Sequence, residues 1–215
     1  MKNAKFNAVA LAACTVVTLA GCGGGGGGSS TATTSLSGSV ADGYITGAKV
    51  CLDVNTNGQC DAGEPTATTV AGGAYSLTGV STADATKPLL VEVPASAVDS
   101  DTPGVAIGKS FVLKAPAGSS FVSPLTTLVQ QKLEDGSAAD VAAAVTAVRT
   151  ALANDGGVTI AGTVDLLKDY VAEKATKTEY ADTHKAAQVL AKSLIANYDV
   201  VKDGASSPAQ LRALQ

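Results

Sequence analysis

The spacing of apolar residues changes once along this chain, near residue 117, and this change limits the fold more than any other feature. Before it, short runs alternate apolar and polar residues, which is typical of strands. After it, apolar residues recur every three or four positions, which is typical of helices. Strands followed by helices indicate an α+β protein. We therefore predict two modules: a small antiparallel β-sandwich over residues 35–117 and an all-α helical domain over residues 118–215.

The first module shows strand runs at regular spacing. Breaks rich in Gly, Asn, Asp and Pro separate runs about 8–12 residues apart, as in sandwiches and unlike βαβ folds. The clearest runs cover residues 49–54, 75–77, 89–93 and 110–114.

The second module carries helix start signals. Ser123 precedes Pro124, which places a capping hydroxyl before a proline at the first helical position. Ser137 and Asp140 resemble a capping box before the next apolar stripe. The predicted helices run over residues 124–133, 141–152, 163–176, 179–200 and 208–214.

The first twenty residues have the pattern of an export signal. Lys2 and Lys5 precede an uncharged apolar stretch over residues 6–20. This stretch of about 15 residues is shorter than the ~20 that a membrane-spanning helix needs. Cleavage is therefore the better interpretation than anchorage by a helix.

The four residues 19–22, Leu-Ala-Gly-Cys, resemble the lipobox of bacterial lipoproteins. The resemblance implies a signal peptide over residues 1–21 and a lipid on Cys22, with membrane anchorage through more than one acyl chain. Gly23, rather than Asp, follows the cysteine, which implies the outer membrane. The alternative is a secreted protein in which this cysteine is incidental.

The segment 22–34 is predicted to be the lipidated cysteine and a linker of Gly, Ser and Thr with a reach of roughly 20 Å.

The whole chain has 15 basic and 19 acidic residues, and loss of Lys2 and Lys5 would change the net charge from −4 to −6. Nucleic acid is not an expected partner, since phosphate binding needs clustered positive charge.

One stretch matches a chemical motif at every specified position. Residues 53–64 fit the twelve-residue calcium loop D-x-[DN]-x-[DN]-G-x₅-E. Calcium prefers six to eight oxygen ligands. Pro65 and the alternating run before the loop place it between strands, unlike the helices of an EF-hand. The predicted ligands are Asp53, Asn55, Asn57, the Gln59 carbonyl, Asp61 directly or through water, and Glu64.

An alternative interpretation is a turn without metal, since Asn, Asp and Gly favour turns anyway. With two Asn in place of Asp, the expected Kd for a structural calcium ion is on the order of 10⁻⁵–10⁻³ M.

The cysteines add a constraint. Cys14 leaves with the signal and Cys22 takes lipid, so we predict a Cys51–Cys60 disulfide in an oxidising compartment.

Several stretches together resemble the carboxypeptidase-regulatory-like and serine-aspartate-repeat B-type domains of bacterial surface proteins. They are Ser37-Gly38-Ser39-Val40, Gly47-Ala48-Lys49-Val50, the loop 53–64, and Gly73-Ala74-Tyr75-Ser76-Leu77. The resemblance implies a prealbumin-like β-sandwich that acts as a rigid, calcium-stiffened spacer.

We find no signature of an enzyme. His184, the only histidine, is expected to face solvent, and Asp99 and Asp101 are expected to lie in a solvated loop. The prediction is a membrane-anchored, non-catalytic lipoprotein acting as a surface or periplasmic interaction module, its protein or glycan partner unspecified. Two alternatives stay open: a carbohydrate-binding accessory lipoprotein, which few aromatic residues disfavour, and an enzyme with its site in the helical half.

Overall fold

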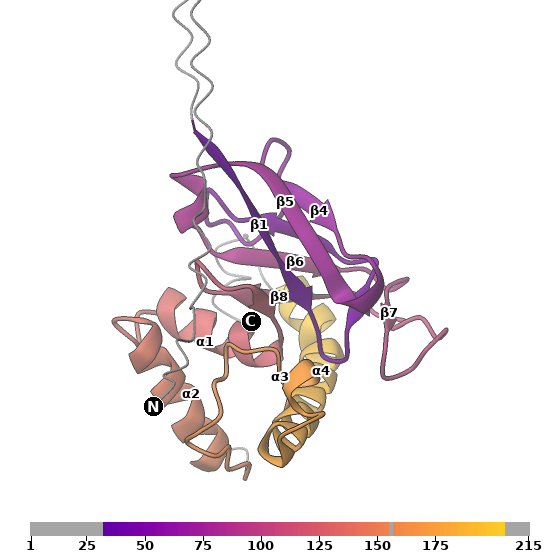
Figure 1. Cartoon of the computed structure of the whole chain (residues 1–215), viewed down its shortest axis with the longest axis vertical. Helices are drawn as coiled ribbons and strands as arrows, with labels where there is room; N and C mark the ends of the chain where they lie inside the picture. The colour runs from indigo at the N-terminus through magenta and orange to yellow at the C-terminus, as the bar shows by residue number, and fades with distance from the viewer. Residues whose placement is uncertain (1–31, 155–156, 205–215) are drawn as a thin grey trace, which may run out of the picture. The chain divides into compact units, whose positions relative to one another are not determined.

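The structure is a computed structural model that describes residues 32–154 and 157–204. Strands come first and helices follow, so the predicted α+β class is confirmed (Figure 1). The predicted signal peptide, Cys22 and the predicted helix 208–214 lie outside the described residues. Contacts gather the described residues into one compact unit.

The strands form two larger sheets and one short pair. The first sheet has the order β5-β1-β9, and the second has the order β4-β3-β6-β8 and is antiparallel throughout. The third is the antiparallel pair β2-β7. Only the short β1–β9 pair among these is parallel. The bounds are β1 Thr33–Val40, β2 Ile45–Thr46, β3 Lys49–Leu52, β4 Thr66–Thr68, β5 Ala74–Ser81, β6 Leu89–Val93, β7 Val98–Asp99, β8 Phe111–Ala115 and β9 Phe121–Val122.

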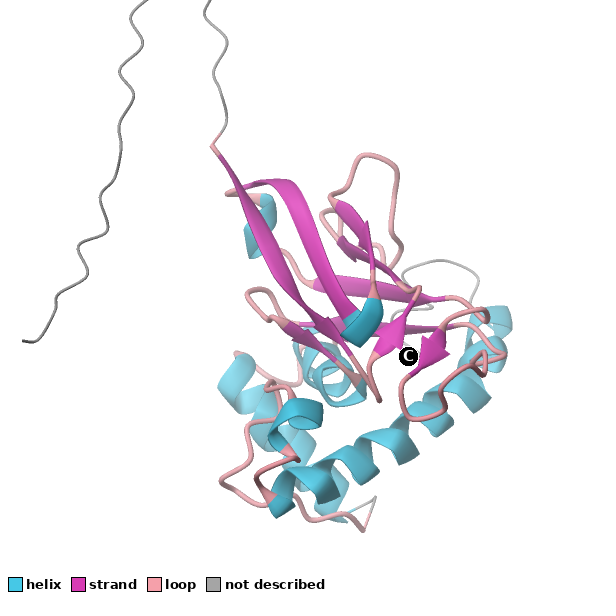
Figure 2. Cartoon of the chain, turned by 45° about the vertical axis from the view of Figure 1, so that its right-hand side comes forward, coloured by secondary structure: helices cyan, strands magenta, loops and turns pink. Residues whose placement is uncertain are grey.

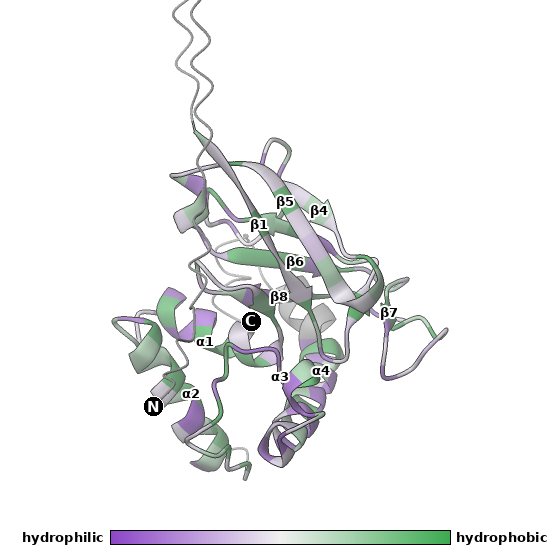
Figure 3. Cartoon of the chain, in the orientation of Figure 1, coloured by the Kyte–Doolittle hydropathy of each residue, from purple (hydrophilic) through white to green (hydrophobic). Residues whose placement is uncertain are grey.

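The two larger sheets share one apolar core. Alternate residues of β5, such as Tyr75 and Leu77, are buried against Val50 and Val91 of the second sheet. The predicted period-two runs therefore do place one side of each strand in the core. Figure 3 shows apolar colouring along β6 and paler colouring along the Ser- and Thr-rich β1.

The helices lie on one side of the strands (Figure 2). Their bounds are α1 Pro124–Glu134, α2 Val141–Asn154, α3 Tyr170–Glu173 and α4 Thr178–Gly204, with short 3₁₀ turns at Ala71–Gly73 and Asp84–Thr86. The start of α1 is as predicted, because Ser123 and Thr126 form a reciprocal capping box. The cap of α2 is Asp140, whose carboxylate accepts the Ala143 N–H, and not Ser137.

The predicted helix 163–176 is wrong over most of its length. Residues 163–169 form turns, and only Tyr170–Glu173 is helical. One reason is that the Arg149 guanidinium binds the Val164 carbonyl, which a helix would need for itself, as well as the Ala161 carbonyl just before the segment. Asp169 then caps α3 through the Ala172 N–H. The segment still buries its apolar residues without a long helix.

The helices share a core with the strands. Phe121 of β9 packs edge-on against Tyr170 of α3, and both belong to an apolar cluster with Leu125 and Val129 of α1. Lys114 of β8 is buried and pairs with Glu134 of α1 at 2.8 Å. Within residues 32–154 and 157–204, no helix combines the length and apolar character needed to span a membrane.

Candidate functional site

The predicted calcium loop connects two strands of the second sheet, as expected. It leaves β3 after Leu52 and meets β4 at Thr66. Backbone hydrogen bonds close its base: the Leu52 N–H donates to the Pro65 carbonyl at 3.3 Å, and the Asp53 N–H donates to the Pro88 carbonyl at 3.0 Å. The sheet therefore fixes both ends of the loop at one place.

Asp53, the first predicted ligand, is buried at the bottom of the loop with 2% of its surface exposed. Its two oxygens accept the N–H groups of Asn57 and Gly58, each at 2.9 Å. These backbone donors offset part of the cost of burying a carboxylate. The fold of the loop needs glycine at Gly58, whose φ of 78° is unfavourable for residues with a side chain.

The next predicted ligands converge. Asn55 and Asn57 both donate from Nδ2 to the same Asp61 oxygen, at 2.8 Å and 2.7 Å. The Asn55 and Asn57 side-chain oxygens in turn accept the N–H groups of Asn57 and Gln59. Three side chains from separate parts of the loop therefore face one another across a short distance.

Glu64, the last predicted ligand, ties the end of the loop to its beginning. Its Oε1 accepts the Val54 N–H at 2.8 Å, and its Oε2 accepts the Asp61 N–H at 2.9 Å. Asp61, Glu64 and Asp84 also line an open hollow of about 590 Å³ beside the loop. The hollow is therefore lined by three acidic side chains.

The disulfide between Cys51 and Cys60 is confirmed, with 5.7 Å between the two Cα atoms. Cys51 is fully buried in β3, and Cys60 is the eighth residue of the loop. Two hydrogen bonds also hold the backbone of Cys60. Its N–H donates to Glu92 Oε1 at 3.1 Å, and its carbonyl accepts from Lys49 Nζ at 2.9 Å.

The oxygens of this loop suit a hard cation, which prefers carboxylate and carbonyl ligands. Among the described residues, no three or more His, Cys, Asp or Glu side chains gather closely enough to hold an ion by themselves. The predicted ligand set also includes two amides and a backbone carbonyl, so this finding neither supports nor refutes calcium. The lipidation site, Cys22, lies outside the described residues.

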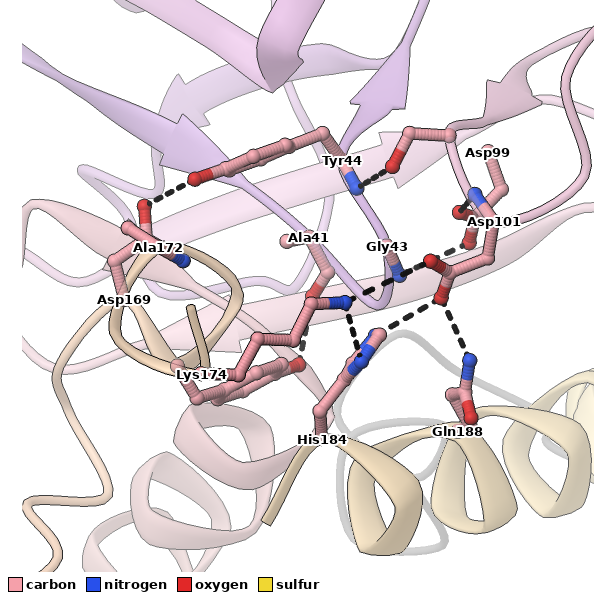
Figure 4. Close-up of polar contacts among 12 residues, drawn as sticks. Ala41, Gly43, Tyr44, Asp99, Asp101, Asp169, Ala172, Lys174, His184 and Gln188 are labelled. Atoms are coloured by element: carbon pink, nitrogen blue, oxygen red, sulfur yellow. Dashed lines mark hydrogen bonds and ion pairs between the residues drawn. The ribbon is translucent and has the colours of Figure 1, made fainter. Parts of the chain in front are cut away.

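A second polar site joins the strand half to the helical half (Figure 4). We call it the Asp42 cluster; its members are Asp42 and Asp101 from turns beside β2 and β7, Asp99 from β7 itself, Lys174 from the end of α3, and His184 from α4. Two neighbours extend it. The Tyr44 hydroxyl donates to Asp169 at 3.0 Å, and Gln188 donates to Asp101 at 2.7 Å.

The expectation that His184 faces solvent is wrong, since only 6% of its surface is exposed. Its ring stacks on Tyr170, which covers one face. Lys174 Nζ lies 2.7 Å from His184 Nδ1. An ammonium group can only donate, so Nδ1 is the acceptor in this contact. Nε2 lies 2.9 Å from Asp101 Oδ2, although not in line for a straight hydrogen bond.

Two carboxylates of the Asp42 cluster, those of Asp42 and Asp99, are partly shielded from water. Burial, with added repulsion from Asp99 and Asp101, raises the pKa of Asp42 to about 7. Within the described part of the chain, the buried Asp42 Oδ1 has no hydrogen-bond partner. Burial also raises the pKa of Asp99, although the Gly43 N–H donates to it. The expectation of a solvated loop is therefore wrong for Asp99, which is half-buried in β7, whereas Asp101 is exposed as expected.

Sequence reasoning missed this cluster for a simple reason. Asp42 belongs to an Asp-Gly pair of the kind found in any turn. His184 is more than 140 positions away, and nothing local connects the two. The only hint was that the single histidine lies on a predicted helix with an apolar stripe. Such a stripe packs against the rest of the protein, and this packing can also bury a neighbouring histidine.

The chain was compared with protein-family models, with curated proteins and with solved structures, and none of the three comparisons finds a match.

Proposed function

We propose that this protein is an exported, membrane-anchored lipoprotein whose calcium-stabilised β module serves as a non-catalytic structural or interaction unit of the cell envelope. The observation that carries the proposal is the arrangement of residues 53–64. Backbone N–H groups hold the carboxylates of Asp53 and Glu64 at the two ends of the loop, while Asn55, Asn57 and Asp61 converge between them.

A cation explains why these groups are together. Three carboxylates in one twelve-residue loop repel one another, and the two amide Nδ2 groups offset that repulsion only in part. A bound calcium ion supplies the positive charge in place of the two Nδ2 groups. The side-chain amides of Asn55 and Asn57 then turn their oxygens toward the ion. Asp53, Asn55, Asn57, the Gln59 carbonyl, Asp61 and Glu64 then supply at least six oxygens, the number that calcium prefers.

The remaining parts of the proposal rest on the sequence. The lipobox-like residues 19–22 support a lipid on Cys22, and Gly23 supports the outer membrane. The resemblance to carboxypeptidase-regulatory-like domains, together with two sheets around one core, supports a prealbumin-like sandwich acting as a spacer. A Cys22→Ser variant expressed in a Gram-negative host should move from the membrane fraction to the periplasmic extract; retention in membranes would contradict lipid anchorage.

Calcium binding is tested by calorimetric titration of the purified, signal-free chain after dialysis against chelator. The expected Kd lies on the order of 10⁻⁵–10⁻³ M. At a calcium concentration one hundred times Kd, linkage adds about 2.7 kcal/mol to the free energy of unfolding. For a chain of this size, that gain raises Tm by roughly 5–10 °C.

Glu64→Gln should weaken calcium binding at least tenfold, because it removes one of the three charges of the loop. Asp182→Asn is the matched control, since it removes an exposed carboxylate of α4 and should leave the Kd unchanged. If the dialysed parent chain binds no calcium and its Tm does not respond, the site assignment is wrong.

A further inference from the structure

The middle of the calcium loop is attached to the sheet at Cys60. Three links meet there: the disulfide to Cys51, the N–H donated to Glu92, and the carbonyl bound by Lys49. Lys49 and Glu92 are register partners on β3 and β6 and lie 3.6 Å apart as an ion pair. The backbone N–H and the carbonyl of Cys60 are thus both hydrogen-bonded to side chains of the sheet.

Cys60 also lies directly between two of the predicted ligands. The Gln59 carbonyl precedes it and the Asp61 carboxylate follows it. A loop residue that is bonded covalently to a buried strand cannot move by much, so its neighbours on either side are restrained as well. The hydrogen bonds of residues 55–59 given above run within the loop itself, to Asp53, Asn55, Asn57 and Asp61.

We infer that the disulfide and the Lys49–Glu92 pair position the ligands at residues 59 and 61, so that calcium binding and the oxidation state of the cysteines are coupled. This inference rests on the proposed calcium site. When the disulfide is intact, the entropy of bringing the two halves of the loop together is already lost, and calcium needs only to bind. When it is reduced, part of the binding energy is spent on ordering residues 55–61.

The chemistry of the switch is ordinary thiol–disulfide exchange with a dithiol. Reduction breaks the Cys51–Cys60 bond, adds two electrons and two protons to give two thiols, and leaves the dithiol as its own disulfide. Coupling between two binding equilibria is reciprocal. Calcium must therefore make the disulfide harder to reduce by the same factor by which the disulfide tightens calcium binding.

The first test uses the unmodified protein. Its cysteines are brought to equilibrium in dithiol redox buffers, once with calcium at a concentration that saturates both the oxidised and the reduced chain and once with chelator, and the thiols are counted by alkylation and mass spectrometry. We expect calcium to lower the reduction potential by at least about 30 mV, which corresponds to a tenfold change in the equilibrium constant. A potential that does not change with calcium overturns the coupling.

The second test measures the calcium Kd of Cys51→Ala/Cys60→Ala, which should be at least tenfold weaker than that of the parent chain. Lys49→Met, with the disulfide intact, should weaken binding about three- to tenfold, while the exposed Lys185→Met control should not change it. Lys49→Met also keeps the test valid if the double variant does not fold. Equal Kd values in all these proteins overturn the positioning role, whereas no binding by the oxidised parent overturns the calcium site and the coupling together.

Discussion

Replacing Asp42 by Asn should change how the stability of this protein depends on pH. The pKa of Asp42 is about 7 in the folded chain, against 3.8 for an ordinary Asp. Burial is the main cause, followed by the charges of Asp99 and Asp101, while Lys192 of α4 acts in the opposite direction. The folded state therefore holds the Asp42 proton more tightly than the unfolded state does.

The sign and size of the effect follow from linkage. The stability contributed by the Asp42 proton is complete below about pH 4, decreases as the pH rises, and is lost once the pH has passed about 7. Between pH 5 and pH 8.5, the pKa difference corresponds to at most about 3 kcal/mol of unfolding free energy. Asn does not titrate, so Asp42→Asn should lack this loss. The Tm of Asp42→Asn minus the Tm of the parent should therefore be roughly 5–10 °C larger at pH 8.5 than at pH 5.

The assay is thermal or urea unfolding of both proteins at pH 5 and pH 8.5 in chelator, so that calcium does not contribute. Asp182→Asn, which removes an exposed carboxylate of α4, is the control and should follow the parent at both pH values. If Asp42→Asn differs from the parent by the same amount at pH 5 and pH 8.5, Asp42 does not titrate in this range and the reasoning is wrong.

Three further substitutions test the packing by urea denaturation. Gly43→Ala should lower stability by about 1–3 kcal/mol, because its Cβ would lie 2.1 Å from an oxygen of Asp99. Ser123→Ala should cost about 1–2 kcal/mol through loss of the α1 cap; an unchanged midpoint would argue against that cap. Glu134→Ala should cost about 3 kcal/mol by leaving Lys114 buried without its partner, and adding Lys114→Met should recover part of this loss.

Much of the fold could be predicted from local patterns. The period-two run around Val50 and Leu52 is a strand, and the hydroxyl of Ser123 before Pro124 starts a helix, because both signals act within a few residues. The loop 53–64 is of the same kind, since every residue of the calcium motif lies within that one stretch, although calcium binding itself stays a prediction. The cysteine pair could be predicted as well, because only two cysteines remain after the predicted signal and lipid positions are set aside.

The tertiary structure alone decided the rest. Residues 163–169 have apolar residues at helical spacing, yet Arg149 from another helix binds the Val164 carbonyl and the helix does not form. His184 looks like an exposed residue of a polar stretch, yet Tyr170 and Asp101 cover it. In both cases the deciding partner is distant in the sequence. Charges and carbonyls lose their water only when two distant segments meet, and no local pattern records which segments will do so.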